Sequence, residues 1–123
     1  MRIRDHQDLQ VYQLAFDCAM QIFEITKTFP KEERYSLTDQ IRRSSRSVTS
    51  NLAEAFRKRR YPKAFVAKLN DSEGEAAETQ VWLEYSLKCK YISVKEFDKL
   101  NTDYDHIIGK LVNMERYPEK WSV

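Results

Sequence analysis

The strongest constraint on the fold is a repeat of apolar side chains at every third or fourth position, which recurs in four segments of the chain. This spacing places the apolar side chains on one face of an α-helix. Pro30, Tyr61-Pro62 and Pro118 fall between or after these segments, where a proline ends one helix or suits the first turn of the next. Ser93-Val94-Lys95-Glu96 has the pattern of a capping box and predicts the start of the fourth helix.

The segments predict four helices: residues 9–27, a second from about Lys31 or Ser36 to about Lys58, a third after Pro62, and a fourth from Ser93 to Pro118. Only two glycines and three prolines occur in 123 residues, which disfavours a turn-rich β-sandwich or a disordered chain. Because short connections force neighbouring helices to run antiparallel, we expect an all-α, antiparallel up-down-up-down four-helix bundle, with residues 1–123 as a single domain. The inner faces predicted for the last three helices are Leu37, Ile41, Ser44, Ser45, Val48, Leu52, Ala55 and Phe56; then Phe65, Leu69, Ser72, Ala76, Thr79, Leu83 and Leu87; then Phe97, Leu100, Tyr104, Ile107, Ile108, Leu111 and Met114.

The first helix differs from the others because it is apolar on two sides. One row consists of Leu9, Tyr12, Phe16, Ala19, Met20 and Phe23, and the other of Val11, Leu14, Ala15, Cys18, Ile22 and Ile25. If a monomeric bundle covers only one row, the second row predicts contact with another copy of the chain. Alternatively, two helices of the same bundle cover both rows. A second apolar patch lies late in the third helix. Together with the second row of the first helix, it gives the predicted oligomer interface: Val11, Ala15, Cys18 and Ile22 of the first helix, and Val81, Trp82 and Tyr85 of the third.

Basic residues are concentrated in one part of the chain. The net charge is +2, but residues 42–68 hold nine basic residues and a single acid, Glu54. On a helical wheel, the arginines of the second helix lie away from its apolar face, as a stripe that continues into a cluster at the helix end. Because guanidinium groups bind phosphate oxygens, this basic stripe predicts a nucleic-acid-binding surface, beside which Tyr61 could stack on a base. The basic stripe consists of Arg42, Arg43, Arg46, Arg57, Lys58, Arg59, Arg60 and Lys63.

Two other interpretations of the basic stripe remain open. Its arginines could pair with acids of the third helix (Asp71, Glu73, Glu75 and Glu78), although surface pairs contribute only about 0–1 kcal/mol each. The stripe could instead meet an acidic protein partner, which would make the chain a protein-interaction scaffold. No zinc-finger, helix-turn-helix or RNP pattern accompanies the arginines, so we expect any nucleic-acid binding to be largely independent of sequence.

The sequence offers no catalytic motif. Its two histidines, His6 and His106, belong to no nucleophilic arrangement, and neither has a Glu three residues before it, as metal sites in helical bundles require. The two glycines stand alone inside predicted helices, so no glycine-rich phosphate loop is present. Cys18 and Cys89 lack the CxxC spacing of a zinc site. We therefore expect a non-enzymatic protein without catalytic residues, metal, cofactor or small-molecule substrate.

No apolar run approaches the roughly 20 residues that span a bilayer. The first residues also lack the apolar stretch of a signal peptide. We therefore expect a cytoplasmic protein that makes no membrane contact.

Residues 40–55, with the sequence QIRRSSRSVTSNLAEA, resemble the signature of a bacterial family. This family consists of four-helix-bundle proteins encoded in intervening sequences of 23S ribosomal RNA genes, sometimes labelled S23 ribosomal proteins. The chain departs from the family at Ala55, where glycine is usual, and at Asp71-Ser72, where Gly-Ser is usual. The resemblance spans nearly the whole chain, through Leu9-Gln10-Val11-Tyr12, Phe29-Pro30-Lys31-Glu32-Glu33, Tyr35-Ser36-Leu37, Ser72, Glu75 and Glu78-Thr79-Gln80.

The resemblance implies a homo-oligomer, expected to be a pentameric ring, and no known catalytic activity. It also implies kinship with the accessory proteins of diversity-generating retroelements, which are similar basic rings that bind nucleic acid and a reverse transcriptase. Two functional hypotheses follow for this chain: a homo-oligomer that binds RNA or DNA, and a scaffold that binds a protein partner.

Overall fold

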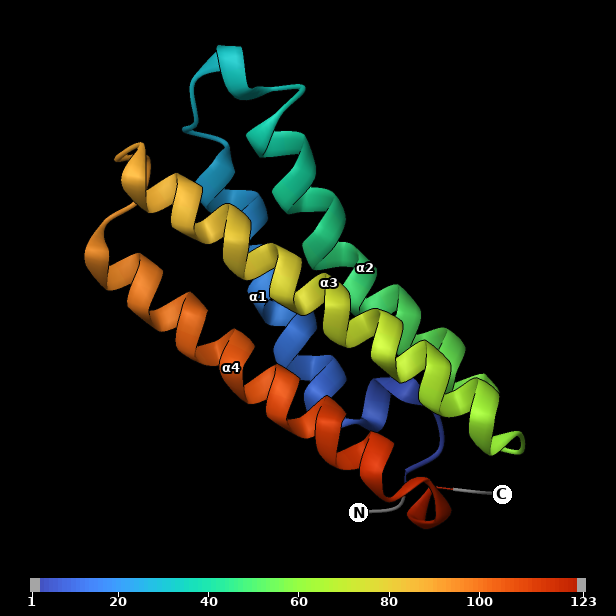
Figure 1. Cartoon of the computed structure of the whole chain (residues 1–123). Helices are drawn as coiled ribbons and strands as arrows, with labels where there is room; N and C mark the ends of the chain where they lie inside the picture. The colour runs from blue at the N-terminus through green and yellow to red at the C-terminus, as the bar shows by residue number, and fades with distance from the viewer. Residues whose placement is uncertain (1–2, 122–123) are drawn as a thin grey trace.

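A computed structural model describes residues 3–121 of the chain. Its elements are η1 (His6–Asp8), α1 (Gln10–Thr26), η2 (Lys31–Glu33), α2 (Leu37–Arg57), α3 (Pro62–Lys88), α4 (Val94–Arg116) and η3 (Pro118–Lys120), where η marks a 3₁₀ turn. Figure 1 shows that each α-helix runs back along the one before it. The described residues contain no strand, so the predicted all-α four-helix bundle is confirmed.

The four α-helices lie at the corners of a square. Both α1 and α3 contact α2 and α4, whereas among the described residues no Cα atoms of the diagonal pairs (α1 with α3, α2 with α4) lie within 8 Å of each other. The 27 residues of α3 correspond to about 40 Å of helix, whereas α1 has only 17 residues. The short turn η1 precedes α1 and contacts α2 as well. This contact brings the start of the chain to the end of the bundle where α2 meets α3.

The helix boundaries follow local sequence signals. Ser93 accepts a hydrogen bond from the backbone N–H of Glu96, and the Glu96 carboxylate accepts one from the backbone N–H of Ser93, so the predicted capping box is confirmed. The second helix begins at Leu37, because Lys31–Glu33 forms a separate 3₁₀ turn. Glu33 holds this connection in place by accepting hydrogen bonds from the Ser36 hydroxyl at 2.7 Å and the Tyr91 hydroxyl at 2.9 Å.

The core confirms the predicted inner faces of the last three helices. Every residue predicted for the inner face of α2 is buried, and of the other two sets only Leu87, Phe97 and Ile108 are partly exposed. Small hydroxyl side chains line the contact of α2 with α3: Ser72 donates to the Val48 carbonyl at 2.7 Å, and Thr79 donates to the Ser44 hydroxyl at 2.8 Å. Their hydrogen bonds satisfy polar groups that burial would otherwise leave unpaired.

The assignment of the two faces of α1 needs a correction. Val11, Ala15, Cys18 and Ile22 are at most 4% exposed within this single chain, so the prediction that they form an oligomer interface is wrong. The helix α1 turns this row toward α2 and α4, the two helices that it contacts. In the other row, Phe16 is 47% and Met20 48% exposed, whereas Leu9 at the start of the helix is buried.

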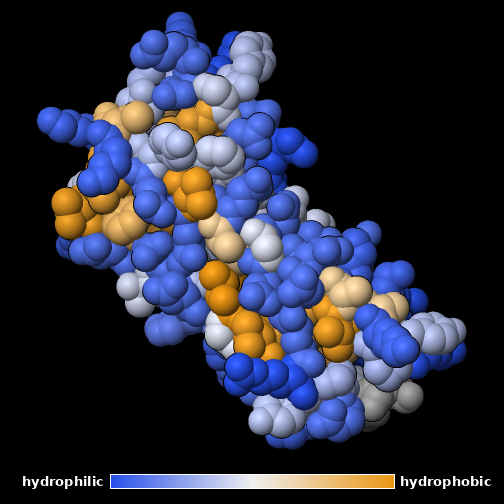
Figure 2. Space-filling view, viewed as in Figure 1, coloured by the Kyte–Doolittle hydropathy of each residue, from blue (hydrophilic) through white to orange (hydrophobic). Residues whose placement is uncertain are grey.

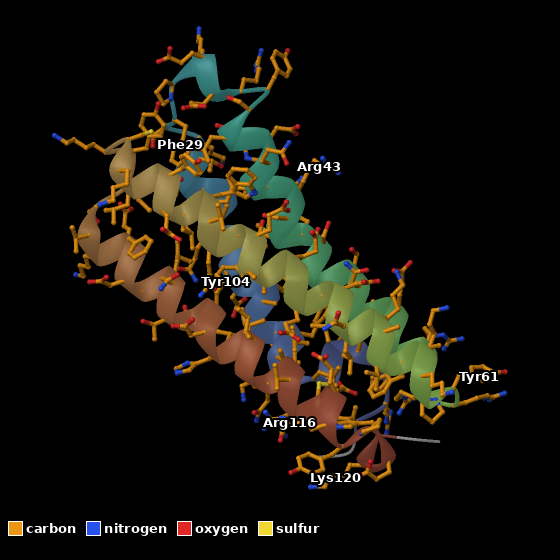
Figure 3. All side chains as sticks on the ribbon, viewed as in Figure 1. Phe29, Arg43, Tyr61, Tyr104, Arg116 and Lys120 are labelled. Atoms are coloured by element: carbon orange, nitrogen blue, oxygen red, sulfur yellow. The ribbon has the colours of Figure 1, made fainter. Side chains whose placement is uncertain are left out.

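Burial of the Tyr104 hydroxyl and partial burial of the Glu115 carboxylate both carry an energetic cost in the packed bundle. The Tyr104 hydroxyl lies inside the bundle without a hydrogen-bond partner among the described residues, and burial raises its pKa above the ordinary range (Figure 3). Between α3 and α4, the Asn70 amide donates to Glu73 at 3.4 Å and to Glu115 at 3.3 Å. Burial, and then a hydrogen bond with Glu73, raise the pKa of Glu115 to about 7.

Candidate nucleic-acid interface

The basic residues of α2 lie on the outside of the bundle, because the apolar positions of the same helix fill the core. Arg43, Arg46 and Arg57 are exposed, and Arg42 is half-buried. Figure 3 shows Arg43 pointing away from the other helices. Between Arg46 and Arg57 the exposed positions of α2 are Ser50, which has a short side chain, and Glu54, the single acid of this part of the chain.

No arginine forms a salt bridge in the part of the chain that the structure describes, residues 3–121. The pairs that do form involve lysines, and on the α2–α3 face Lys68 contacts Glu54 at 2.9 Å and Asp71 at 3.9 Å. The hydrogen bond from Lys68 holds the pKa of Glu54 below its usual value. Glu54, the single acid of the basic region, is thus paired with a lysine of α3. Among residues 3–121, no acid of α3 forms an ion pair with an arginine, so the interpretation in which these acids neutralise the arginines has no support within one chain.

Arg42 and Arg46 both lie over the Phe23 ring of α1, but only the Arg42 guanidinium also donates hydrogen bonds to neutral groups of that helix. Its Nε donates to the Thr26 hydroxyl at 2.8 Å, and its Nη2 donates to the Phe23 carbonyl at 3.4 Å. The guanidinium carbon lies 4.8 Å from the centre of the Phe23 ring. Arg42 therefore joins α2 to the last turn of α1. The negative end of the α1 helix dipole lies there and stabilises a nearby cation. Sequence reasoning placed this residue in the stripe but missed its structural contact.

A second group of cations surrounds the turn from α2 to α3, which Figure 3 marks by Tyr61 at one end of the bundle. Lys58 and Lys63 are exposed there. Arg46 and Arg57 are separated by about 16 Å along the helix, at 1.5 Å per residue. The basic stripe is therefore divided into a central part (Arg42, Arg43 and Arg46) and an end cluster (Arg57, Lys58, Arg59, Arg60 and Lys63).

The end cluster includes a cavity of about 360 Å³, which brings together residues that sequence reasoning did not connect. Arg4 and His6 line it from the start of the chain, and Arg57, Arg59 and Arg60 line it from the end of α2. These two segments are some 50 positions apart in the sequence, and no local pattern predicts that they meet. The contact of η1 with α2 brings them together.

The remaining surface gives no sign of a metal centre or a membrane span. Among the described residues, no group of three or more His, Cys, Asp or Glu side chains is placed to hold a metal ion. None of the four α-helices is both long and apolar enough to cross a bilayer. On the face formed by α3 and α4, Figure 2 shows apolar patches separated by hydrophilic side chains.

Fold and surface together define an all-helical bundle with a cationic outer face on α2. Residues 7–113 match the family model described as 23S rRNA-intervening sequence protein, and the chain belongs to this family. The chain is 28% identical to a protein of unknown function from the S23 ribosomal protein family of Bacteroides thetaiotaomicron VPI-5482. That crystal structure superposes with a TM-score of 0.77, covering 86% of this chain and 95% of the other. No curated protein gives a significant match.

Proposed function

We propose that the chain is a non-enzymatic, homo-oligomeric bundle that binds RNA or DNA through the basic stripe, largely without regard to sequence. One observation carries the proposal: Arg43, Arg46, Arg57 and Arg60 are exposed, and none of them has a carboxylate partner within residues 3–121. Unpaired guanidinium groups bind phosphate oxygens bidentately and release the counterions of the nucleic acid. The family name refers to the gene in which such proteins are encoded, and it supplies no ligand.

The shape of α2 favours contact with a phosphate backbone. The hydroxyls of Thr49 and Ser50 donate to carbonyls of their own helix, so they do not project as further donors. Between Arg46 and Arg57, a strand running along the helix would pass the short Ser50 side chain and the Glu54 carboxylate, whose charge is already paired with Lys68 of α3. Contacts of this kind position a backbone and do not read bases.

Self-association is the second part of the proposal, with a pentameric ring as the expected form. Phe16 and Met20 on α1 form one exposed apolar patch, and Val81 and Tyr85 on α3 form another, with the half-buried Trp82 beside them. Two different patches permit a head-to-tail contact, which closes into a ring when the rotation between neighbours allows. A ring would present several copies of the basic stripe to one strand and raise the total affinity.

The mass of the untreated protein in light scattering tests the oligomer. We expect a multiple of the 14.7 kDa chain mass, and a smaller mass for the Phe16→Ser/Met20→Ser variant. The matched control is Tyr35→Ser, which removes an aromatic ring that is 86% exposed in the connection from α1 to α2. A monomeric wild-type protein would refute self-association.

Fluorescence anisotropy with mixed-sequence RNA and DNA oligonucleotides tests nucleic-acid binding. We expect binding that weakens steeply between about 50 and 200 mM salt, and a loss of about tenfold in affinity at the lower salt for each phosphate contact removed by Arg43→Glu/Arg46→Glu. The control Lys88→Glu/Lys95→Glu changes the net charge equally at exposed positions of α3 and α4. No binding at the lower salt, or equal affinity of the two double variants, would refute the role of the stripe.

A pull-down with and without nuclease separates this function from a protein scaffold. If nucleic acid binds, nuclease treatment should remove most co-purifying material. Partners that survive nuclease, in a protein that binds no oligonucleotide, would favour the scaffold.

A further inference from the structure

The cavity beside the α2–α3 turn is a recess and not a flat basic surface, and we call it the end pocket. Phe56, Arg57, Arg59, Arg60 and Tyr61 line it from α2 and the turn, and Arg4, Asp5 and His6 line it from the start of the chain. Its volume of about 360 Å³ exceeds that of a single phosphate group and leaves room for part of a nucleotide. Figure 3 shows Tyr61 at the tip of the turn, and its side chain is one of those that line the recess.

Several side chains of the end pocket are held in place before any ligand arrives. The Arg59 guanidinium lies flat against Phe56, with its central carbon 3.6 Å from the ring centre, and its Nε donates to the Phe56 carbonyl at 2.9 Å. The His6 ring packs edge-on against Tyr12, with 4.9 Å between ring centres. A fixed guanidinium loses less side-chain entropy when it binds an anion than a freely rotating one does.

The start of the chain is also fixed where it lines the pocket. The backbone N–H of Arg4 donates to the Asp8 carboxylate at 2.7 Å, and the backbone N–H of Gln7 donates to the Asp5 carboxylate at 2.8 Å. The backbone N–H of Asp5 also donates to the Asp8 carboxylate, at 3.4 Å, as part of the capping box of η1, and the separate hydrogen bond from Arg4 orients the Arg4 backbone at the pocket edge. The carboxylate of Asp5 is therefore engaged by the backbone of its own turn.

The charge of the end pocket is strongly positive. Four arginines line it against the single carboxylate of Asp5, and none of the four forms a salt bridge within the described residues. Burial, and then the neighbouring charge of Arg57, lower the pKa of Arg59. Cations that repel one another in a recess are stabilised when an anion binds between them.

We propose that the end pocket binds a phosphate monoester, such as the terminal phosphate of a nucleotide or of a nucleic-acid strand, with Arg59 and Arg60 as its main ligands and Tyr61 stacking on the attached base. A terminal phosphate carries about −1.5 to −2 charge and three acceptor oxygens, so it can use several guanidinium donors at once. An internal phosphodiester carries a single charge and is flanked by sugars on both sides, which hinders its entry into a recess. The choice of a strand end as the natural ligand rests on the proposed function.

The test compares decathymidylate with and without a 5′-phosphate by anisotropy, and thymidine 5′-monophosphate with thymidine by calorimetry, all on the full-length protein. We expect the terminal phosphate to raise affinity about tenfold, which corresponds to one well-placed charge-assisted contact. The pocket variants Arg4→Gln/Arg60→Gln and Arg59→Lys should remove this gain, the second because lysine lacks the planar fork. The control Arg43→Gln/Arg46→Gln should weaken both oligonucleotides equally and keep the gain.

The results separate failure of the pocket from failure of the proposed function. Equal affinity for the two oligonucleotides, with no heat from thymidine 5′-monophosphate, would overturn the end pocket while salt-dependent binding of both would still support the stripe. A gain that persists in both pocket variants would also overturn it. If the mononucleotide binds the wild type but not the pocket variants, and neither oligonucleotide binds, the pocket stands as a nucleotide site and the proposed function fails.

Discussion

Replacing Arg42 by methionine should destabilise the bundle by about 2 kcal/mol, although Arg42 belongs to the basic stripe. The hydrogen bond from its Nε to Thr26, at 2.8 Å, is charge-assisted and contributes about 1.5–3 kcal/mol. The cation–π contact with Phe23, at 4.8 Å, adds about 0.5–1 kcal/mol at a partly exposed site. These contributions overlap because one guanidinium makes both, and methionine keeps the packing of the aliphatic stem. The expected loss in the free energy of unfolding, about 2 kcal/mol, is therefore smaller than most sums of the two contributions.

Urea unfolding followed by circular dichroism measures the loss in the free energy of unfolding. In a thermal melt, the same loss should lower Tm by about 8 °C for a chain of this length. The matched control is Arg43→Met, which changes the charge equally at the next, exposed position and should stay within about 0.5 kcal/mol of the wild type. A double-mutant cycle with Thr26→Val should give a coupling energy of about 1 kcal/mol or more between the two residues. Equal stability of the Arg42 and Arg43 variants, or a coupling near zero, would refute the structural role of Arg42.

Three further predictions concern stability. Since the pKa of Glu115 is raised to about 7 from 4.5, the folded state holds an extra proton between these values, and stability should fall as pH rises through this window. Glu115→Gln should abolish that slope, and at pH 8 its free energy of unfolding in urea titrations should exceed that of the wild type by about 1 kcal/mol. This difference is smaller than the full pKa shift implies, because the side chain is partly exposed. An unchanged slope in the variant would contradict the prediction. Tyr104→Phe removes a buried, unpartnered hydroxyl and should raise the free energy of unfolding by about 1 kcal/mol, whereas a decrease would indicate a hidden partner. Ser93→Ala should lower the free energy of unfolding by about 1 kcal/mol, with a loss below about 0.3 kcal/mol showing that the cap is dispensable.

The sequence was sufficient for the helices and for most of the core. The inner faces of α2 and α4 follow the 3.6-residue period, and on α3 the same period identifies the buried stripe, although Val81 and Tyr85 add an exposed apolar patch beside it. Ser93 and Pro62 marked helix starts through local chemistry, which depends on neighbouring residues alone. The signature from Gln40 to Ala55 identified the family for the same reason, because it is contiguous.

The orientation of α1 could not be predicted, because both of its rows are apolar and the period by itself does not rank them. Packing decided in favour of Val11, Ala15, Cys18 and Ile22, while Phe16 stayed outside. Residues that looked like an interface became core, and of the other row only Phe16 and Met20 became exposed surface. The distinction depends on which row fits between two neighbouring helices, and that is a property of the assembled bundle.

The sequence by itself determined the charge of α2, the four helical segments and the family, since each depends on residue type and spacing along the chain. The tertiary structure decided which cations are unpaired, because a salt bridge requires two side chains within about 4 Å and the acids of α3 do not reach the arginines. It also placed the Arg42 guanidinium against the last turn of α1, where it donates to Thr26, and it placed Arg4 and His6 around the same cavity as Arg59. These last groupings join residues far apart in sequence, and folding alone brings them within reach of one another.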